Sequence, residues 1–230
     1  MNPADRRQLR LLVFDWDGTL MDSTASIVRA ARAAIRDLGL PERSPDAIRD
    51  IIGLGLKESW TALFPELDAR SYLPFVDRYR EHFVLRERDR SALYPGVEHT
   101  LGCLRASGWS LAVATGKSRA GLDHDLQRTG LSETFDASRT ADETRSKPDP
   151  QMLCELLDEL DIRPQATLMI GDTEYDLQMA HAAGVASLGI TWGAHSEDRL
   201  RTLASAACLN SVGRLPDWLE QVDAELAQGR

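Results

Sequence analysis

The stretch LLVFDWDGT at residues 11–19 decides how the rest of the chain is organised. Residues 11–16 form an almost continuous apolar run that ends at a turn signal, which is typical of a short buried strand of a parallel sheet. Asp17, Gly18 and Thr19 supply the turn. We therefore expect a sheet to begin here, with Asp15 and Asp17 near the end of its first strand.

The residues from about 22 to 90 carry helical patterns and no strand signal. A first helix is expected over residues 23–39, with Ser23 as its N-cap and Gly39 as its C-cap. Further helical patterns follow at residues 44–53 and 71–89, with a glycine-rich loop at residues 52–59. This region is interpreted as a helical insert after the first strand.

After Tyr94-Pro95-Gly96, strand and helix patterns alternate. Strands are expected at residues 109–115, 135–140, 166–172, 185–191 and 207–210, and helices at residues 97–108, 118–130, 151–160, 175–184 and 196–205. Asp149 suits the N-cap and Pro150 the first position of the helix that contains residues 151–160. Such alternation predicts a doubly wound parallel α/β sheet. The predicted organisation is a discontinuous core of residues 1–20 and 91–230 with a helical domain of residues 21–90 inserted in it.

Chemically active side chains gather where these strands end, which is the edge at which open α/β sheets bind ligands. The residues that follow the strand ends, or that stand in a loop before a helix, are Asp15, Asp17, Thr115, Gly116, Lys117, Lys147, Asp172 and Asp176. Carboxylates crowded in this way repel one another. A divalent cation with oxygen ligands relieves that repulsion, and Mg²⁺ suits two carboxylates together with a phosphate oxygen.

The other residues of this set suit a phosphoryl group. Gly116 allows a close approach of the backbone, and the helix start after it offers N–H groups to an anion. Thr115 can donate to a phosphoryl oxygen, and Lys147, held out of helical geometry by Pro148, can neutralise charge. Only three of the 27 Lys and Arg residues are lysines, and two of them, Lys117 and Lys147, stand in these motifs. This preference indicates a need for a compact point charge there.

The sequence resembles the haloacid-dehalogenase superfamily of phosphohydrolases over nearly its whole length. Four signatures occur in the order of that family: DWDGT at residues 15–19, Thr115 at a strand end, Lys147 before Pro148, and GDTEYD at residues 171–176. The helical insert lies between the first two signatures, as in the branch that contains phosphoglycolate phosphatases, β-phosphoglucomutases, phosphonatases and dehalogenases. The resemblance implies a phosphatase with a Rossmann-like core and an all-helical cap domain.

The resemblance also implies roles for the acids. Asp15 attacks phosphorus and forms an aspartyl-phosphate. Asp17 protonates the leaving oxygen and then activates the hydrolytic water. The implied cofactor is Mg²⁺, bound by Asp15, the carbonyl of Asp17 and Asp172, with Asp176 in or near its outer shell.

Thr115 and Lys147 are implied to hold the phosphoryl group. Gly116 and Lys117 are further candidate substrate-binding residues, although a solvent-facing helix start is an alternative for Lys117. Trp16 occupies the position between the two aspartates, where smaller aliphatic or acidic residues are common in the family. We expect it to point away from the site, with little effect on the chemistry.

Composition excludes several classes of protein. A net charge of −9 without a basic stripe argues against a nucleic-acid partner. No apolar run reaches the roughly 18 residues of a membrane span, and the charged start is too short for a secretory signal, so a cytoplasmic protein is expected. The three cysteines form no metal pattern, and the five histidines lie outside the motifs and receive no role. Nothing in the sequence indicates an oligomeric state.

Asp17 favours phosphoryl transfer over dehalogenation, because dehalogenases normally lack an acid at that position. A phosphosugar mutase or another phosphotransferase shares this core and stays open as an alternative, whereas a non-catalytic binding module is expected to have lost an acid. The expected substrate is a small phosphorylated metabolite. Phosphoglycolate is favoured by resemblance, and sugar phosphates, nucleotides and pyrophosphate are alternatives.

The helical insert is expected to set specificity, with the loop at residues 52–59 over the site. Its aromatic residues Trp60, Tyr72, Phe75 and Phe83 are more typical of a packed cap core than of a stack against substrate. Phosphonatases of the same branch form a Schiff base with a cap lysine, and Lys57 is the only lysine of the insert. Glu58 follows it directly, which favours a hydrated and charged amine. Lys57 is therefore expected to contact a distal group of the substrate at most.

Overall fold

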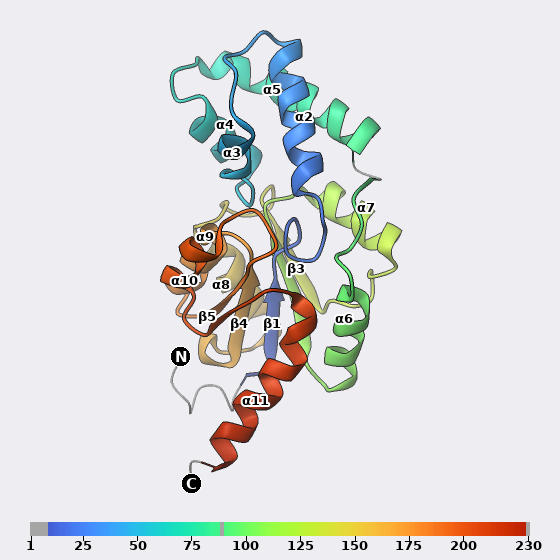
Figure 1. Cartoon of the computed structure of the whole chain (residues 1–230), viewed down its shortest axis with the longest axis vertical. Helices are drawn as coiled ribbons and strands as arrows, with labels where there is room; N and C mark the ends of the chain where they lie inside the picture. Colours follow the sequence, from blue (N-terminus) through green and yellow to red (C-terminus); the bar gives the residue numbers. More distant parts are fainter. Residues whose placement is uncertain (1–8, 88–89, 229–230) are drawn as a thin grey trace.

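The computed structural model describes residues 9–87 and 90–228 (Figure 1). A sheet flanked by helices forms one part of the molecule, and a group of helices lies beyond one end of that sheet. None of the helices in the described part of the chain combines the length and the apolar character needed to span a lipid bilayer. The charged stretch at residues 1–8, from which a cytoplasmic location was inferred in part, lies outside the described residues.

Within the described residues, six parallel strands form one sheet in the order β3-β2-β1-β4-β5-β6. Their bounds are β1 (Leu11–Phe14), β2 (Ser110–Thr115), β3 (Ala137–Thr140), β4 (Thr167–Gly171), β5 (Ala186–Ile190) and β6 (Ala207–Leu209). The predicted α/β class and parallel sheet are confirmed, and each strand falls inside its predicted range. Because β1 lies between β2 and β4, the direction in which strands are added reverses there, and the ends of these three strands border the crevice that binds ligands in such sheets.

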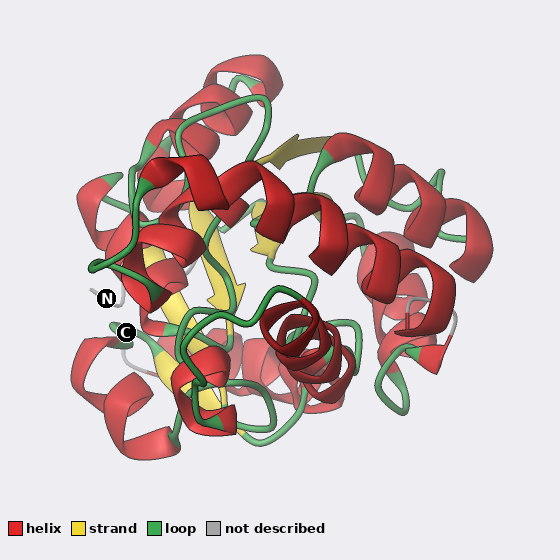
Figure 2. Ribbon diagram, turned by 90° about the horizontal axis from the view of Figure 1, so that it is seen from above, coloured by secondary structure: helices red, strands yellow, loops and turns green. Residues whose placement is uncertain are grey.

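Helices cover both faces of the sheet, and Figure 2 shows them surrounding the strands. The helices on one face are α6 (Val97–Ala106), α7 (Arg119–Thr129) and α11 (Leu215–Gln228), and those on the other are α8 (Gln151–Leu160), α9 (Glu174–Ala182) and α10 (Glu197–Leu203). Short 3₁₀ turns, η4 (Pro164–Ala166) and η5 (Val212–Arg214), complete the core. Side chains alternate along β1, so Leu12 and Phe14 pack towards the first face while Leu11 and Val13 pack towards the second.

Helix α8 begins slightly later than predicted. Its first residue is Gln151, with Pro150 at the N-cap position. The carboxylate of Asp149 nevertheless accepts a hydrogen bond from the backbone N–H of Gln151 at 3.0 Å. Asp149 therefore satisfies one of the unpaired donors at this helix start, one position away from the predicted geometry.

The inserted region consists of helices and the loops between them, and no strand lies between residues 22 and 87, as predicted. Its elements are α2 (Thr24–Asp37), α3 (Pro45–Arg49), α4 (Leu56–Leu63), the 3₁₀ turn η1 (Ala69–Ser71), α5 (Tyr72–His82) and the π-helical turn η2 (Phe83–Glu87). They enclose an apolar cluster of their own that includes Trp60, Phe64 and Phe75. Helix α4 begins at Leu56, so only the first half of the predicted loop at residues 52–59 is a loop.

The chain passes between the two parts at adjacent positions. Met21, on the way out of the core, forms an antiparallel bridge with Leu93, on the way back. Leu20 and Met21 still belong to the apolar core beneath the sheet. We propose residues 21–90 as the cap domain and residues 1–20 and 91–230 as the core domain, with Met21 at the boundary and its side chain packed in the core.

Candidate active site

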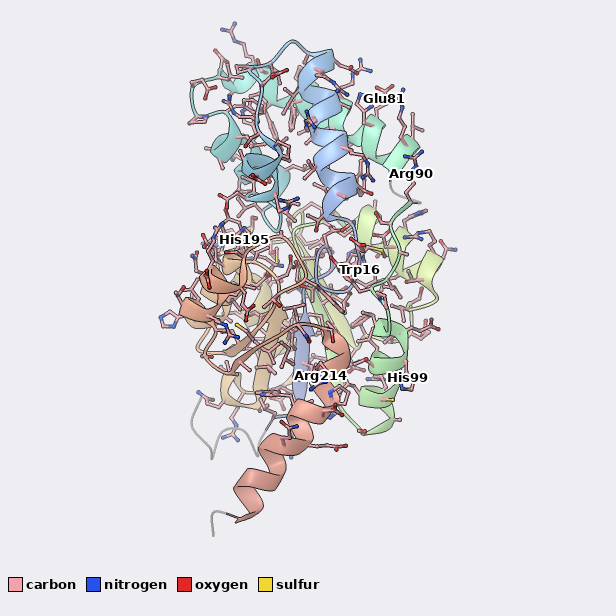
Figure 3. The ribbon with its side chains drawn as sticks, in the orientation of Figure 1. Trp16, Glu81, Arg90, His99, His195 and Arg214 are labelled. Carbon is pink, nitrogen blue, oxygen red and sulfur yellow. The ribbon has the colours of Figure 1, made fainter. Side chains whose placement is uncertain are left out.

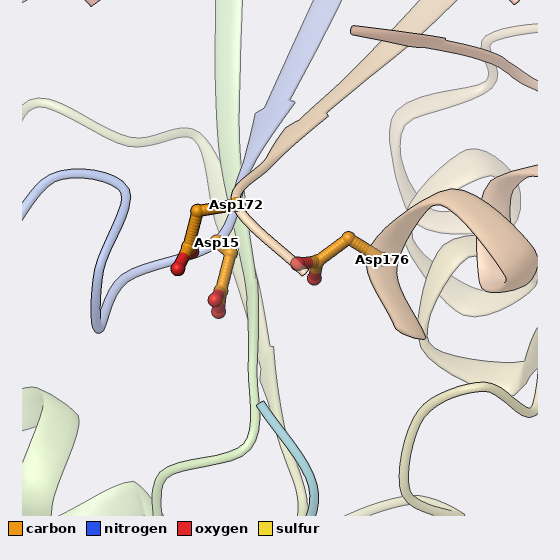
Figure 4. Close-up of side chains that lie close together, drawn as sticks. All are labelled: Asp15, Asp172 and Asp176. Atoms are coloured by element: carbon orange, nitrogen blue, oxygen red, sulfur yellow. The ribbon is translucent and has the colours of Figure 1, made fainter. Parts of the chain in front are cut away.

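Three carboxylates meet at the ends of β1 and β4 (Figure 4). Asp15 follows β1, Asp172 follows β4, and Asp176 lies in the first turn of α9. One oxygen of each lies within 4.8 Å of the others, and all three side chains are buried. The helix starts between Asp172 and Asp176, with Thr173 as its N-cap, and this brings the second acid back towards the first.

Lys147 places a single ammonium group among these acids. Its Nζ lies 2.7 Å from Oδ1 of Asp15 and 2.6 Å from Oδ1 of Asp176, and its side chain is fully buried. Burial opposes the charged form, but the carboxylates of Asp15 and Asp176 outweigh it and raise the pKa of Lys147. One positive charge among three acids leaves the cluster short of positive charge.

The three carboxylates differ in how they are held. Asp172 accepts hydrogen bonds from Oγ1 of Thr19 and from the backbone N–H of Ala194, each at 2.7 Å. Asp176 accepts from the N–H and Oγ1 of Thr173 through its second oxygen. Apart from the 2.7 Å contact between Oδ1 and Nζ of Lys147, the two buried oxygens of Asp15 have no hydrogen-bond partner among the described residues. Asp15 is thus the acid of the three with an oxygen, Oδ2, that has no partner among the described residues.

The electrostatics of the site reflect this crowding. Burial raises the pKa of Asp15 well above its usual value, and Asp176 and Asp172 raise it further while Lys147 opposes the shift. Burial together with Asp176 raises the pKa of Asp172 to about 7. A carboxylate in such a place is stabilised by an additional cation.

The residues present fit a divalent metal ion. The donors are hard carboxylate oxygens, which is the ligand type that Mg²⁺ and Ca²⁺ take. The backbone also closes tightly around them. Gly18 has φ +86°, and a Cβ there would lie 2.2 Å from Oδ2 of Asp172, so a side chain would fill this cradle.

Asp17 lies apart from the metal-like cluster and faces the cap. Its Oδ1 accepts a hydrogen bond from Oγ of Ser23 at 2.6 Å, and its Oδ2 lies 3.2 Å from Nζ of Lys117. Ser23 stands at the N-cap position of α2, but its side chain makes no capping bond. Ser23 is therefore the N-cap residue as predicted, but its hydroxyl donates to Asp17 and accepts no hydrogen bond from the start of the helix.

Lys117 is buried, so the alternative of a solvent-facing helix start is wrong. Its Nζ lies between Asp17 and Asp125, 3.0 Å from Oδ2 of the latter. Burial would lower the pKa of Lys117, but the two carboxylates raise it. The indole N–H of Trp16 donates to the same oxygen of Asp125 at 3.1 Å. Trp16, which we expected to have little effect, thus supports the partner of Lys117.

Thr115 and Gly116 stand where β2 ends. Thr115 is buried, and its Oγ1 accepts from the backbone N–H of Lys117 at 3.3 Å. Gly116 has the cap loop as its close neighbour, since a Cβ there would lie 2.6 Å from the carbonyl oxygen of Gly53. Both line a cavity that also exposes Asp15 and Asp17. The lack of a side chain at Gly116 therefore lets the cap loop approach the end of β2 closely.

Polar contacts hold the cap loop on the core at two points. The backbone N–H of Gly55 donates to Oγ of Ser146 at 2.7 Å, next to Lys147. At the other end of the loop, the carbonyl of Asp50 accepts from the hydroxyl of Tyr175 at 2.9 Å. The loop at residues 50–55 is thus fixed across the mouth of the site.

His195, to which no role was assigned from the sequence, is part of this attachment. Figure 3 shows it at the border between core and cap. Its Nδ1 accepts from the N–H of Glu174 at 3.1 Å, so Nε2 carries the proton and donates to the carbonyl of Asp50 at 3.1 Å. Burial lowers the pKa of His195 and favours this neutral form. Arg199 adds ion pairs to Asp50 and Glu174.

Of the two residues that received no role from the sequence, Asp125 and His195, only Asp125 has a local sequence signal. Asp125 occurs on the apolar face of α7 beside Leu122 and is almost fully buried. An acid on the buried face of a helix requires a partner, and this requirement points to a nearby cation. By contrast, nothing local marks His195, because its partner Asp50 is 145 residues away in the chain.

Comparisons with known proteins agree with this architecture. The family model described as haloacid dehalogenase-like hydrolase matches residues 12–190. A probable phosphatase IndB from Dickeya dadantii is 38% identical over 83% of this chain and 85% of its own length. A phosphoglycolate phosphatase from Chromobacterium violaceum is 32% identical over 93% of this chain and 98% of its own length. The crystal structure of a haloacid dehalogenase-like hydrolase from Bacteroides fragilis has a TM-score of 0.84 and 28% identity, and covers 90% of this chain and 99% of its own.

Proposed function

The chain belongs to the haloacid dehalogenase-like hydrolase family and is a phosphatase, and we propose that it is a Mg²⁺-dependent phosphomonoesterase that acts through an aspartyl-phosphate on Asp15. The observation that carries this proposal is the state of Asp15. Both of its oxygens are buried, Oδ1 lies 2.7 Å from the ammonium group of Lys147, and no other partner among the described residues occupies either oxygen. A carboxylate that is oriented by one contact and otherwise unpaired is available to attack as a nucleophile.

The first half-reaction follows from the positions of four side chains. The phosphoryl group of the substrate lies against Thr115 and Lys147, which hold its oxygens. An oxygen of Asp15 forms a bond to phosphorus, and the bond from phosphorus to the ester oxygen breaks. The electron pair remains on the leaving oxygen, which takes a proton from Asp17. The product alcohol leaves, and Asp15 carries the phosphoryl group.

The second half-reaction restores the enzyme. Asp17, now ionised, accepts a proton from a water molecule as the water oxygen attacks phosphorus. The bond between phosphorus and Asp15 breaks, and inorganic phosphate leaves. A Mg²⁺ ion held by Asp15, the carbonyl of Asp17 and Asp172 would supply charge neutralisation of the phosphoryl oxygens. Asp176 holds Lys147 in place through its 2.6 Å contact.

The substrate is a small phosphorylated metabolite in this proposal. The Chromobacterium violaceum relative is named a phosphoglycolate phosphatase, and the sequence resemblance favours the same ester. The side chains that line the cavity next to Asp15 and Asp17 provide independent evidence on the chemical nature of the leaving group.

The proposal is tested with p-nitrophenyl phosphate in Mg²⁺ and in a chelator. We expect phosphate release only with the metal, and a radiolabelled phosphoenzyme that hydroxylamine cleaves. Asp15→Asn should abolish both, because an amide does not attack phosphorus, whereas Asp158→Asn, at an exposed position of α8, should change neither. Turnover by Asp15→Asn, or turnover without a divalent metal, would contradict the mechanism.

A further inference from the structure

A cavity of about 470 Å³ lies between the cap and the core and opens onto Asp15 and Asp17. Its core side carries the polar groups of the proposed phosphoryl site. Its cap side is built by α2, α4, α5 and η2 and is mainly apolar, with Ser59 and Arg80 as polar members and with Ile27, Ala31, Leu56, Leu63, Phe75 and Phe83 among the apolar lining residues. A volume of this size falls within the range of roughly 300–1,000 Å³ that is typical of small-molecule pockets.

The apolar wall belongs to a cap that is docked on the core. The carbonyl of Gly53 packs against Gly116, and Gly55 donates a hydrogen bond to Ser146. The cavity is therefore not a gap left by a cap that stands away from the site. A group attached to a phosphoryl oxygen near Asp15 and Asp17 has this wall as its nearest surroundings.

Two aromatic residues that we expected to act only in the cap core form part of the wall. Phe75 and Phe83 both line the cavity, and the ring of Tyr79 lies between them. The ring centroids of Tyr79 and Phe83 are 5.8 Å apart with an interplanar angle of 18°, and those of Phe75 and Tyr79 are 6.3 Å apart at 20°. This row of stacked rings gives the cavity a rigid apolar side.

The charges on the lining do not suit a second anionic group deep in the cavity. The cations among the described lining residues are Arg80 and Lys117. Lys117 already lies within 3.2 Å of Asp17 and 3.0 Å of Asp125, and Arg80 is exposed. A carboxylate of the leaving group that lay among the apolar side chains of the wall would lose its hydration, which is costly, and would have to reach the exposed Arg80 to gain a charged partner.

We propose that the substrate is a phosphate monoester whose leaving group is an apolar chain or ring that fills this cavity, an inference that rests on the proposed function. The phosphoryl group lies at Asp15, Thr115 and Lys147, and the alkyl or aryl part of the leaving alcohol lies against α2, α4 and the rings of Phe75 and Phe83. Phosphoglycolate, whose leaving group is small and ends in a carboxylate, is then a poor substrate.

The test is a series of esters with Mg²⁺: ethyl, butyl, hexyl and 2-phenylethyl phosphate, together with phosphoglycolate. The leaving alcohols of the first four have similar acidity, so differences report the burial of apolar groups. We expect kcat/KM to rise by about fourfold per methylene that enters the cavity, and by at least about tenfold from ethyl to hexyl phosphate. Phosphoglycolate, which matches ethyl phosphate in length, should be no better than ethyl phosphate.

Two variants locate the effect. Leu56→Asn replaces a lining side chain with a polar one of similar size, and Ala31→Phe fills the cavity, so each should lower the ratio of the hexyl to the ethyl rate. The matched control is Leu73→Asn, at a leucine that is 66% exposed on the cap, and it should leave both rates unchanged. Each ratio is measured on one protein preparation, so partial loss of folded protein affects both esters equally.

The outcomes separate this inference from the proposed function. Hydrolysis with a flat chain-length series, or with phosphoglycolate preferred over hexyl phosphate, overturns the apolar leaving group and leaves the phosphatase standing. A steep series that Leu56→Asn and Ala31→Phe leave unchanged also overturns it. No hydrolysis of any ester, p-nitrophenyl phosphate included, overturns the proposed function and this inference with it.

Discussion

The ammonium nitrogen of Lys117 lies 3.2 Å from Oδ2 of Asp17. Because Asp125 holds the same ammonium group at 3.0 Å from the other side, Lys117 is fixed in position and in turn orients Asp17. The side chains of all three are largely buried, so solvent does not compete strongly for these contacts. We therefore propose that Lys117 acts by orienting Asp17, the proposed acid and base, whereas the sequence suggests Lys117 as a substrate-binding residue.

Lys117→Met separates these two roles. If Lys117 positions Asp17, its loss should lower kcat for an alkyl phosphate by about tenfold or more, since a small misplacement of a catalytic group is costly, and should change KM little. If it binds the substrate instead, KM should rise while kcat is retained. Lys57→Met is the matched control and should behave like the wild type, because Lys57 is exposed on the cap and is not among the residues that line the cavity. Steady-state kinetics below the melting temperature decide between the two.

Much of the fold follows from local patterns. The apolar runs of β1, β2, β4 and β5 are buried between helices on both faces and are therefore nearly continuous, whereas the edge strands β3 and β6 are only partly buried. The edge on which Asp15, Thr115 and Asp172 meet was predictable as well, because parallel strands end at the same edge. These residues lie together because their strands are parallel neighbours, and the order of strands and helices along the chain is enough to predict this.

Contacts between the cap and the core were not predictable in this way. Ser23 has the sequence pattern of an N-cap, but its hydroxyl donates to Asp17 and accepts no hydrogen bond from the helix. The carbonyl of Asp50 is held by Tyr175 and His195, which are far away in the sequence and follow different strands. Such partners depend on how the cap is docked, and neither periodicity nor spacing carries that information.

Asp17→Asn should remove proton transfer while it preserves the shape of the site. We expect the rate with an alkyl phosphate to fall by about 10²–10⁴-fold. With p-nitrophenyl phosphate the loss in the first half-reaction should be much smaller, because nitrophenolate leaves without a proton. The measurement is the ratio of single-turnover rates for the two esters in the variant and the wild type. Equal losses for good and poor leaving groups would argue against Asp17 as the acid.

Lys147→Arg should be poorly tolerated although the charge is kept. The side chain of Lys147 is fully buried and contacts Asp15 and Asp176 at 2.7 and 2.6 Å, and a planar guanidinium does not fit between them as a point charge does. We expect kcat to fall by about 100-fold or more, consistent with displacement of a group that contacts the nucleophile. The reverse exchange at a nearby exposed position, Arg145→Lys, serves as control and should be neutral. A near-normal kcat for Lys147→Arg would count against this placement.

The free energy of unfolding of the metal-free protein should fall as the pH rises, and the titration of Asp172 is the contribution to be tested. Its pKa is about 7 in the folded protein, mainly because of burial, whereas an unfolded aspartate titrates near 4. Between these values the folded state binds a proton that the unfolded state does not, so the free energy of unfolding falls as the pH rises from about 4 to about 7. Above that range both states are ionised and this contribution stops changing.

Another group acts in the opposite direction over part of this range. Burial lowers the pKa of His195, so its contribution to stability is lost as the pH falls. The difference in Tm between Asp172→Asn and the wild type cancels this effect, because His195 is present in both. Asparagine also keeps the contacts of Asp172, since it can accept from Ala194 and donate to Thr19.

We therefore expect the Tm of Asp172→Asn minus the Tm of the wild type to increase from pH 5 to pH 8 in the presence of a chelator. A gain of about 3 °C or more is expected, because 1 kcal/mol corresponds to about 2–4 °C in a chain of this size. Mg²⁺ should raise the Tm of the wild type most at pH 8, where the carboxylates are ionised and free to bind it, and should raise that of the variant less. A Tm difference that stays constant with pH, or that shrinks towards pH 8, would show that Asp172 is not held in the protonated form in the metal-free site.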